Sequence, residues 1–229
     1  PLQESLGLAN RSSEFDKYLA QFKHLNPDAK GVESVEFETA KNLYFNQNYS
    51  KAIQSLSGYA ASYPDSPRVP EAKYYEAESY YRLKEFAKAL EVYQQIGADP
   101  SFAMLNKVVG RIAELQFKAG KYDLAVKSFR GLATMASNKK DEHTAWNGLM
   151  ESYYLLAQYD SCDVFAQRVL EHGSINASAH NKASLYLGKS AMARGNYEVA
   201  KDEFLTTLNT ARDEYGAEAK YLLGEIFYL

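Results

Sequence analysis

The chain has 229 residues, of which 46% are hydrophobic, with a formal net charge of −3 and a pI near 5.9. This composition is sufficient for a folded core and argues against a nucleic-acid-binding protein, which needs a basic surface to neutralise phosphates. The single cysteine, Cys162, excludes an internal disulfide and a cysteine-based zinc site. No uninterrupted apolar run reaches the ~18 residues that a membrane-spanning helix requires.

Residues 1–32 are predicted to be a linker followed by one helix. The first dozen residues are weakly patterned, whereas apolar residues recur at three- and four-residue spacing between Ser13 and Leu25. That spacing is one stripe of an amphipathic helix. Asn26-Pro27-Asp28 ends the helix, because proline lacks the backbone donor and restricts the residue before it. We interpret this helix as the second helix of a degenerate leading repeat.

From Glu33 the chain repeats a unit of two amphipathic helices, A and B. Its aromatic anchors are Tyr49, Phe86, Tyr122, Tyr159 and Tyr197, at intervals of 37, 36, 37 and 38 residues. A fixed period of this size indicates a stacked repeat array. The predicted units are near 33–69, 70–105, 106–142, 143–180 and 181–216, with a partial unit at 217–229. The polar stretch 137–142 is predicted to link the third unit to the fourth, whose helix A starts at Thr144. The predicted fold is all-α.

Small residues recur at the two places where paired helices should approach most closely. On helix B they are Ala52, Ala89, Ala125, Cys162 and Ala200, and on helix A they are Ala40, Ala77, Ala113, Gly188 and Gly224, with Met150 as the exception. Close antiparallel packing of helices requires small side chains at the contact. In unit four the large and small groups have exchanged places, with Met150 on helix A and Ala166 on helix B. Gly120 and Gly195 supply the positive φ that ends a helix A.

This pattern resembles the tetratricopeptide repeat. The match is fullest at Trp146, Leu149, Tyr153 and Tyr159 in unit four and at Leu187, Gly188, Gly195, Tyr197, Ala200 and Phe204 in unit five. The resemblance implies a right-handed superhelix of antiparallel helix hairpins, with the A helices forming its concave wall. The period here is two to four residues longer than the usual thirty-four. A narrower similarity, around Tyr63-Pro64-Asp65-Ser66-Pro67, is to repeats of bacterial envelope proteins: the Tol-system cell-division coordinator and the outer-membrane assembly lipoproteins.

The resemblance also implies which residues face the groove and hold a partner. They are Phe37, Lys41, Tyr44, Tyr74, Glu78, Tyr81, Glu114, Phe117, Asn147, Glu151, Tyr154 and Lys189. Aromatic residues with a polar edge are frequent binding hot spots, and the row Glu78, Glu114 and Glu151 favours a partner with basic groups. The alternative is that the aromatic residues pack against the neighbouring unit and that the glutamates are ordinary surface helix formers.

Catalysis finds no support in the residues. The four histidines are scattered and are interpreted as solvated residues near helix ends, and Cys162 at a packing position should be inert. No glycine-rich phosphate loop or nucleophile elbow is present, so we expect no catalytic residues, no metal and no cofactor. The chaperone-tail clamp of some tetratricopeptide domains is also excluded, because Phe37, Lys41 and Tyr75 stand at its places and only Lys107 and Arg111 match.

The leading hypothesis is a non-catalytic scaffold that holds a peptide or helix of a protein partner, of basic or apolar character. An RNA-reading helical array is the weaker alternative, because the groove glutamates would repel phosphates. A structural or oligomerisation segment is the second alternative: Leu222, Leu223, Ile226, Phe227 and Leu229 have no following helix B, so either a longer chain continues or this end pairs with another copy. The similarity favours the periplasm or the outer membrane, with the cytoplasm as the alternative.

Overall fold

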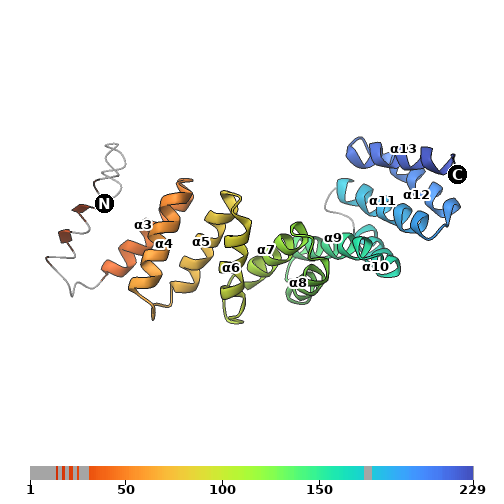
Figure 1. Ribbon diagram of the computed structural model, residues 1–229. Coiled ribbons are helices and arrows are strands. Elements are labelled where there is room, and N and C mark those ends of the chain that lie inside the picture. The colour runs from red at the N-terminus through yellow and green to blue at the C-terminus, as the bar shows by residue number, and fades with distance from the viewer. Residues whose placement is uncertain are drawn as a thin grey trace. The chain divides into compact units, whose positions relative to one another are not determined.

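The computed structural model describes residues 31–172 and 177–228, together with the single residues Glu14, Lys17, Tyr18, Gln21, Phe22 and Leu25. The predicted linker and leading helix within 1–32 therefore lie almost entirely outside the described residues. The described chain is helical, with no strand in it (Figure 1). Its helices are α3 (Val32–Phe45), α4 (Tyr49–Ser62), α5 (Val69–Arg82), α6 (Phe86–Gly97), α7 (Leu105–Lys118), α8 (Tyr122–Met135), α9 (Lys139–Leu155), α10 (Tyr159–Glu171), α11 (Ala177–Ala193), α12 (Tyr197–Thr210) and α13 (Glu214–Ile226).

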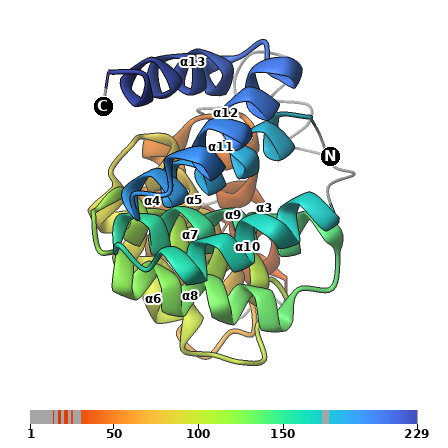
Figure 2. The ribbon, with the colours of Figure 1, turned by 90° about the vertical axis from the view of Figure 1, so that its right-hand side faces the viewer.

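The helices form two compact units, one ending at Glu85 and one beginning at Phe86. In each unit, every helix packs against the next in the chain, and each A helix also contacts the next A helix: α3 with α5 in the first unit, and α7 with α9, α9 with α11 and α11 with α13 in the second. Both views show α13 lying against α11 and α12 (Figure 1, Figure 2). This arrangement confirms the predicted all-α stack of helix pairs.

The predicted small residues lie at the closest contacts of the helix pairs. Ala52, Ala89, Ala125, Cys162 and Ala200 are all completely buried. The larger residues four positions later, which fill the space between pairs, are buried too: Leu56, Tyr93, Phe129 and Phe204. Because only small side chains fit where two helices approach closely, this alternation of small and large side chains sets the spacing of the stack.

The same backbone turn ends five A helices. At each turn one residue has a positive φ: 71° at Gly120, 77° at Gly195, and 61°, 61° and 56° at Gln47, Lys84 and Ala157. Two hydrogen bonds recur there, as in the bonds from Ala157 N–H to the Tyr154 carbonyl and from Gln158 N–H to the Tyr153 carbonyl, both 2.9 Å. This is the Schellman motif, in which a left-handed residue lets the chain reverse and satisfies the last carbonyls of the helix.

Replacing a non-glycine residue of positive φ, at Gln47, Lys84 or Ala157, by glycine should stabilise the protein. Ala157→Gly should raise the free energy of unfolding by about 0.5–1 kcal/mol, because a Cβ at positive φ is strained by more than glycine loses in chain entropy. Gly120→Ala is the matched control and should lower it by a similar amount. A Cβ on Gly120 would have no atom within 4 Å, so only the backbone conformation can produce that loss. Urea denaturation measures both variants, and equal stability of the two would contradict the explanation.

The structure corrects the start of two helices. The stretch 137–142 is not a linker, because α9 already begins at Lys139: the Asn138 side chain accepts a hydrogen bond from Asp141 N–H at 3.0 Å and caps the helix. The Asp141 carboxylate in turn accepts from the Asn106 amide at 2.7 Å, which ties this cap to α7. Likewise α13 begins at Glu214 rather than at Ala217, with the Asp213 side chain accepting from Tyr215 N–H.

Candidate functional site

In the first unit, the face between the A helices carries a cluster of aromatic rings. The Tyr44 ring on α3 lies 5.1 Å from the Tyr75 ring on α5, and the Phe45 ring lies 5.5 Å from the same Tyr75 ring. Tyr49, at the start of α4, adds a ring 5.8 Å from Tyr44. We call these four residues the first aromatic cluster. The Phe45 side chain is 57% exposed, and the tyrosines are half-buried, so the cluster presents ring surface to solvent.

The second unit repeats this arrangement around a lysine. The Tyr154 ring on α9 meets the Tyr186 ring on α11 edge-on at 5.3 Å. The Lys189 ammonium lies 4.9 Å and 4.8 Å from these two ring centres and pairs with the Glu218 carboxylate on α13 at 2.8 Å. We call Tyr154 and Tyr186 the second aromatic pair. Burial raises the pKa of both tyrosine hydroxyls further above its ordinary value. The Lys189 ammonium therefore contacts two aromatic rings and one carboxylate of its own chain.

Lys41 occupies the matching place in the first unit. Its ammonium lies 5.2 Å from the Phe37 ring and 5.6 Å from the Tyr75 ring, and it pairs with Glu71 on α5 at 3.0 Å. Lys41 and Lys189 therefore each connect one A helix to the next. The charge of each lysine is balanced by a glutamate of the same chain.

Two of the three glutamates in the predicted row pair with cations of the chain itself. Glu78 is buried, with 4% of its surface exposed, and its charge contributes to raising the pKa values of the Tyr44 hydroxyl, which burial raises most, and of Arg82. Glu114 pairs with Arg111 at 3.0 Å and with Lys118 at 2.8 Å. Glu151 pairs with Lys182 on α11 at 2.5 Å. The cations beside Glu114 and Glu151 weaken the electrostatic reason for expecting a basic partner.

The remaining predicted groove residues divide by exposure. Phe37 is 1% exposed and packs against Tyr59 at 5.4 Å, so the expectation that it faces a partner is corrected: it belongs to the core of the first helix pair. Tyr74 is buried as well, whereas Tyr81 and Phe117 are half-buried. Asn147 donates from its amide to the His143 carbonyl at 2.8 Å, which uses the amide group to brace α9.

Sequence reasoning did not single out Phe45, Tyr75 and Tyr186 as groove contacts. Tyr75 stands one position after the predicted groove residue Tyr74, and Phe45 stands one position after Tyr44. A helix surface is broader than a single stripe, so the neighbours at i+1 on the flank could have been included.

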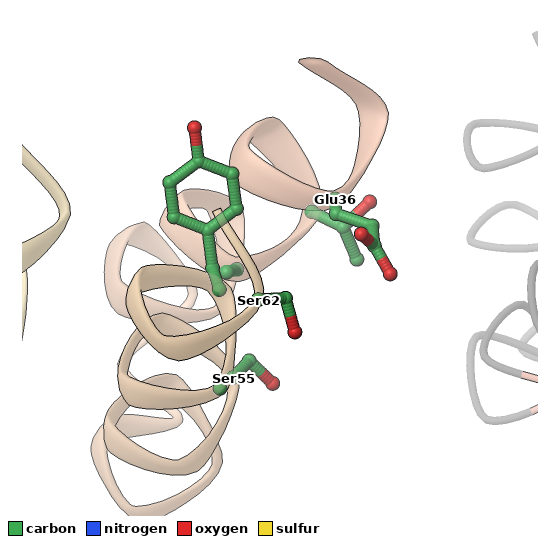
Figure 3. A pocket seen from close by; sticks show the side chains of 7 residues that line it. Glu36, Ser55 and Ser62 are labelled. Atoms are coloured by element: carbon green, nitrogen blue, oxygen red, sulfur yellow. The ribbon is translucent and has the colours of Figure 1, made fainter. Parts of the chain in front are cut away.

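A separate hollow lies on the first helix pair. Its volume is ≈ 280 Å³, and it is lined by residues of α3 and α4, among them the labelled Glu36, Ser55 and Ser62 (Figure 3). The Tyr63 hydroxyl donates to the Glu36 carboxylate at 2.5 Å. This hollow has no residue in common with the first aromatic cluster, and its lining mixes polar side chains with Ala40 and Tyr59.

Cys162 and His143, which could in principle take part in chemistry, are both buried in the helix packing. Cys162 is completely buried, and burial raises the pKa of its thiol to about 12, so little reactive thiolate forms at neutral pH. His143 corrects the prediction of solvated histidines: it is buried, contacts the Trp146 ring, and has its Nε2 3.2 Å from the His172 carbonyl. His24 lies outside the described residues. In the described ranges, no three His, Cys, Asp or Glu side chains come together as metal ligands would. No helix there is both long and apolar enough to cross a bilayer.

Comparisons with known proteins agree with the geometry. Residues 37–101 match the sequence profile of the tetratricopeptide repeat. No curated protein matches the chain. Three similar solved structures are MamA residues 41 to the end from Desulfovibrio magneticus RS-1 (15% identity, 78% of this chain and 94% of that chain, TM-score 0.63), a second MamA crystal structure (10%, 80% and 93%, TM-score 0.66), and a tetratricopeptide repeat protein from Parabacteroides merdae ATCC 43184 (11%, 98% and 95%, TM-score 0.57).

At these identities the solved structures establish the fold alone. The narrower resemblance to Tol-system and outer-membrane lipoprotein repeats stays a prediction. Repeats of this fold suggest a scaffold for protein–protein interaction, and they are typically non-catalytic. Residues 37–101 match the tetratricopeptide repeat model, and the described chain around them has the fold of solved tetratricopeptide-repeat structures.

Proposed function

We propose that this protein is a non-catalytic scaffold that holds a segment of a partner protein on the faces of its A helices. The observation that supports this proposal is the presence of partly exposed rings between consecutive A helices in both units. In the first unit these are Tyr44, Phe45, Tyr49 and Tyr75, and in the second they are Tyr154 and Tyr186. Rings held by their neighbours lose little entropy on binding, which is why aromatic residues dominate binding energy in protein interfaces.

The partner segment is expected to be apolar or aromatic rather than strongly charged. Lys41, Glu114, Glu151 and Lys189 are already paired with charges of the chain itself, so a charged partner would have to replace an existing ion pair. Exchange of one ion pair for another yields little net energy at a partly exposed site. Burial of the rings, in contrast, gains the full hydrophobic contribution of the area removed from water.

The test is partner capture with the whole chain as bait, followed by titration of the captured protein in purified form. Phe45→Ser in the first cluster and Tyr186→Ser in the second pair should each weaken binding about tenfold or more, as expected for loss of a hot spot. The matched control is Tyr197→Ser, which removes a ring of 41% exposure from helix B α12.

Circular dichroism of each variant shows whether the helices persist. If the partner binds Phe45→Ser and Tyr186→Ser as tightly as it binds the wild type, the A-helix faces are not the binding surface. If Tyr197→Ser weakens binding as much as the other two, the contact lies on the B helices instead.

A further inference from the structure

Two arginines and two aromatic rings form a stack across α8, α9 and α10, which pack against one another in the second unit. The Arg130 guanidinium on α8 lies 5.6 Å from the centre of the Tyr153 ring on α9. That ring lies 5.8 Å from the Phe165 ring on α10, with an angle of 12° between the ring planes. The Arg168 guanidinium, also on α10, lies 5.1 Å from the Phe165 ring centre. We call these four residues the arginine stack.

The two rings of the arginine stack are held by the protein core. Tyr153 is 3% exposed and belongs to the buried cluster shared by α8, α9 and α10, and Phe165 packs against the same cluster. A ring in a close-packed core has little freedom to move. Each ring therefore gives one guanidinium a fixed surface, so that Arg130 and Arg168 lose less conformational freedom on binding than arginines that extend into solvent.

Neither guanidinium has a carboxylate partner among the residues that the structure describes. Arg130 and Arg168 are exposed and form no ion pair there, although Glu171 stands three residues after Arg168 on the same helix. Lys182 and Arg194 of the same unit are paired with carboxylates. An aromatic ring covers one face of a guanidinium and leaves the N–H donors at its edge available. An anion could therefore bind the arginine stack without displacing an existing ion pair.

The arginine stack is specific to the third and fourth repeats. Arg130 is the eighth residue after the aromatic anchor of its helix B, where the other units have Ser57, Gln94, Gln167 and Leu205. Arg168 is the ninth residue after its anchor, where the other units have Gly58, Gln95, Gly131 and Thr206. The packing of helix pairs therefore does not require arginine at either place. The stack is also flanked by helices on both sides, so its exposure does not depend on where the chain begins or ends.

We propose that the arginine stack binds an acidic segment of a partner protein, with one carboxylate paired to each guanidinium. The planar guanidinium matches a carboxylate through two parallel hydrogen bonds. The three distances along the stack limit the separation of the two guanidinium groups, and an extended segment of about five residues spans that separation at ~3.3 Å per residue. A nucleic acid is disfavoured, because the chain has a formal net charge of −3.

This surface shares no residue with the aromatic rings of the A-helix faces, and it selects a different chemistry. The A-helix faces are proposed to hold an apolar segment, whereas the arginine stack would hold carboxylates. Failure of either proposal therefore leaves the other intact. Because the guanidinium groups are exposed, the interaction with an acidic segment should weaken as salt screens it.

The test is fluorescence anisotropy of a labelled hexaglutamate peptide titrated with the whole chain at low and at high salt. The peptide should bind at low salt and lose affinity at high salt. Arg130→Gln and Arg168→Gln should each weaken binding about five- to tenfold, as expected for loss of one well-oriented ion pair. Arg168→Lys should weaken binding as well, because an ammonium keeps the charge but cannot form the paired hydrogen bonds.

A matched control removes one positive charge elsewhere. Lys220→Gln alters an exposed residue of α13 and should leave the affinity for hexaglutamate unchanged. Phe45→Ser and Tyr186→Ser should leave it unchanged too, since they alter only the A-helix faces. Circular dichroism of each variant shows whether the helices persist.

Three results would overturn the proposal. The first is a wild-type chain that does not bind hexaglutamate at low salt. The second is a loss of affinity in Lys220→Gln equal to that in Arg168→Gln, or an Arg168→Lys variant that binds as the wild type does, because net charge alone would then explain the binding. The third is tighter binding of a single-stranded oligonucleotide of the same charge, which would assign the surface to nucleic acid instead.

Discussion

Gly148→Ala is expected to lower the free energy of unfolding by about 1–3 kcal/mol, although alanine is the better helix former by about 1 kcal/mol. Gly148 lies within α9, and a Cβ there would be 2.3 Å from Cζ and 2.4 Å from both Cε atoms of the Phe129 ring on α8. The ring is buried in the shared core of α8, α9 and α10, so it cannot move without displacing its neighbours. Urea denaturation at equilibrium measures the loss.

Gly110→Ala on α7 is the control for helix propensity. Its Cβ would meet Leu132 at 3.6 Å, which is ordinary contact, so this variant should gain up to about 1 kcal/mol. Gly188→Ala should behave as Gly148→Ala does, because its Cβ would be 2.5 Å from the Phe204 ring. Adding Phe129→Leu to Gly148→Ala should recover part of the loss by removing the clashing ring atoms. Gly148→Ala as stable as Gly110→Ala would show that the ring does not occupy this position.

Met150→Ala is expected to cost about 2–5 kcal/mol, the range for truncating a large side chain in a packed core. Met150 is completely buried on α9, in the same cluster as the equally buried Ala166 of α10. Units one, two, three and five each have a small residue on helix A and a large one on helix B at the matching positions. The methionine therefore fills the volume that Phe129 or Phe204 fills in its own unit, and truncation leaves a cavity.

Restoring the usual order tests this explanation. Ala166→Met alone should destabilise by overpacking, by about 1–3 kcal/mol. Combined with Met150→Ala it should recover part of the loss, so that the double variant is more stable than the sum of the single changes predicts. A double-mutant cycle in denaturant measures that coupling. Strict additivity would mean that the two side chains fill separate spaces and that the exchange of sizes in unit four is not compensatory.

The helix pairs could be predicted from the sequence because they depend on interactions between residues close in the chain. The period from Tyr49 to Tyr197, the small residues and the turn at Gly120 each act within one hairpin, and the structure confirms the burial and the positive φ that they imply. The start of α9 was misjudged because the polar stretch 137–142 was interpreted as solvated, whereas Asn138 caps a helix there. That error concerns one boundary and does not change the order of the helices.

The character of the A-helix faces depended on tertiary structure. Glu151 and Lys182 are 31 residues apart, and Lys189 and Glu218 are 29 residues apart. Their pairing follows from how far one helix is displaced along its neighbour, and a displacement of one turn would separate the charges. Composition and period leave that displacement open, so the sequence by itself determined the repeating helix pairs and their small contact residues. Which aromatic residues reach solvent, and which charges are already paired, was decided only when neighbouring A helices packed together, because both depend on distances between residues a whole repeat apart.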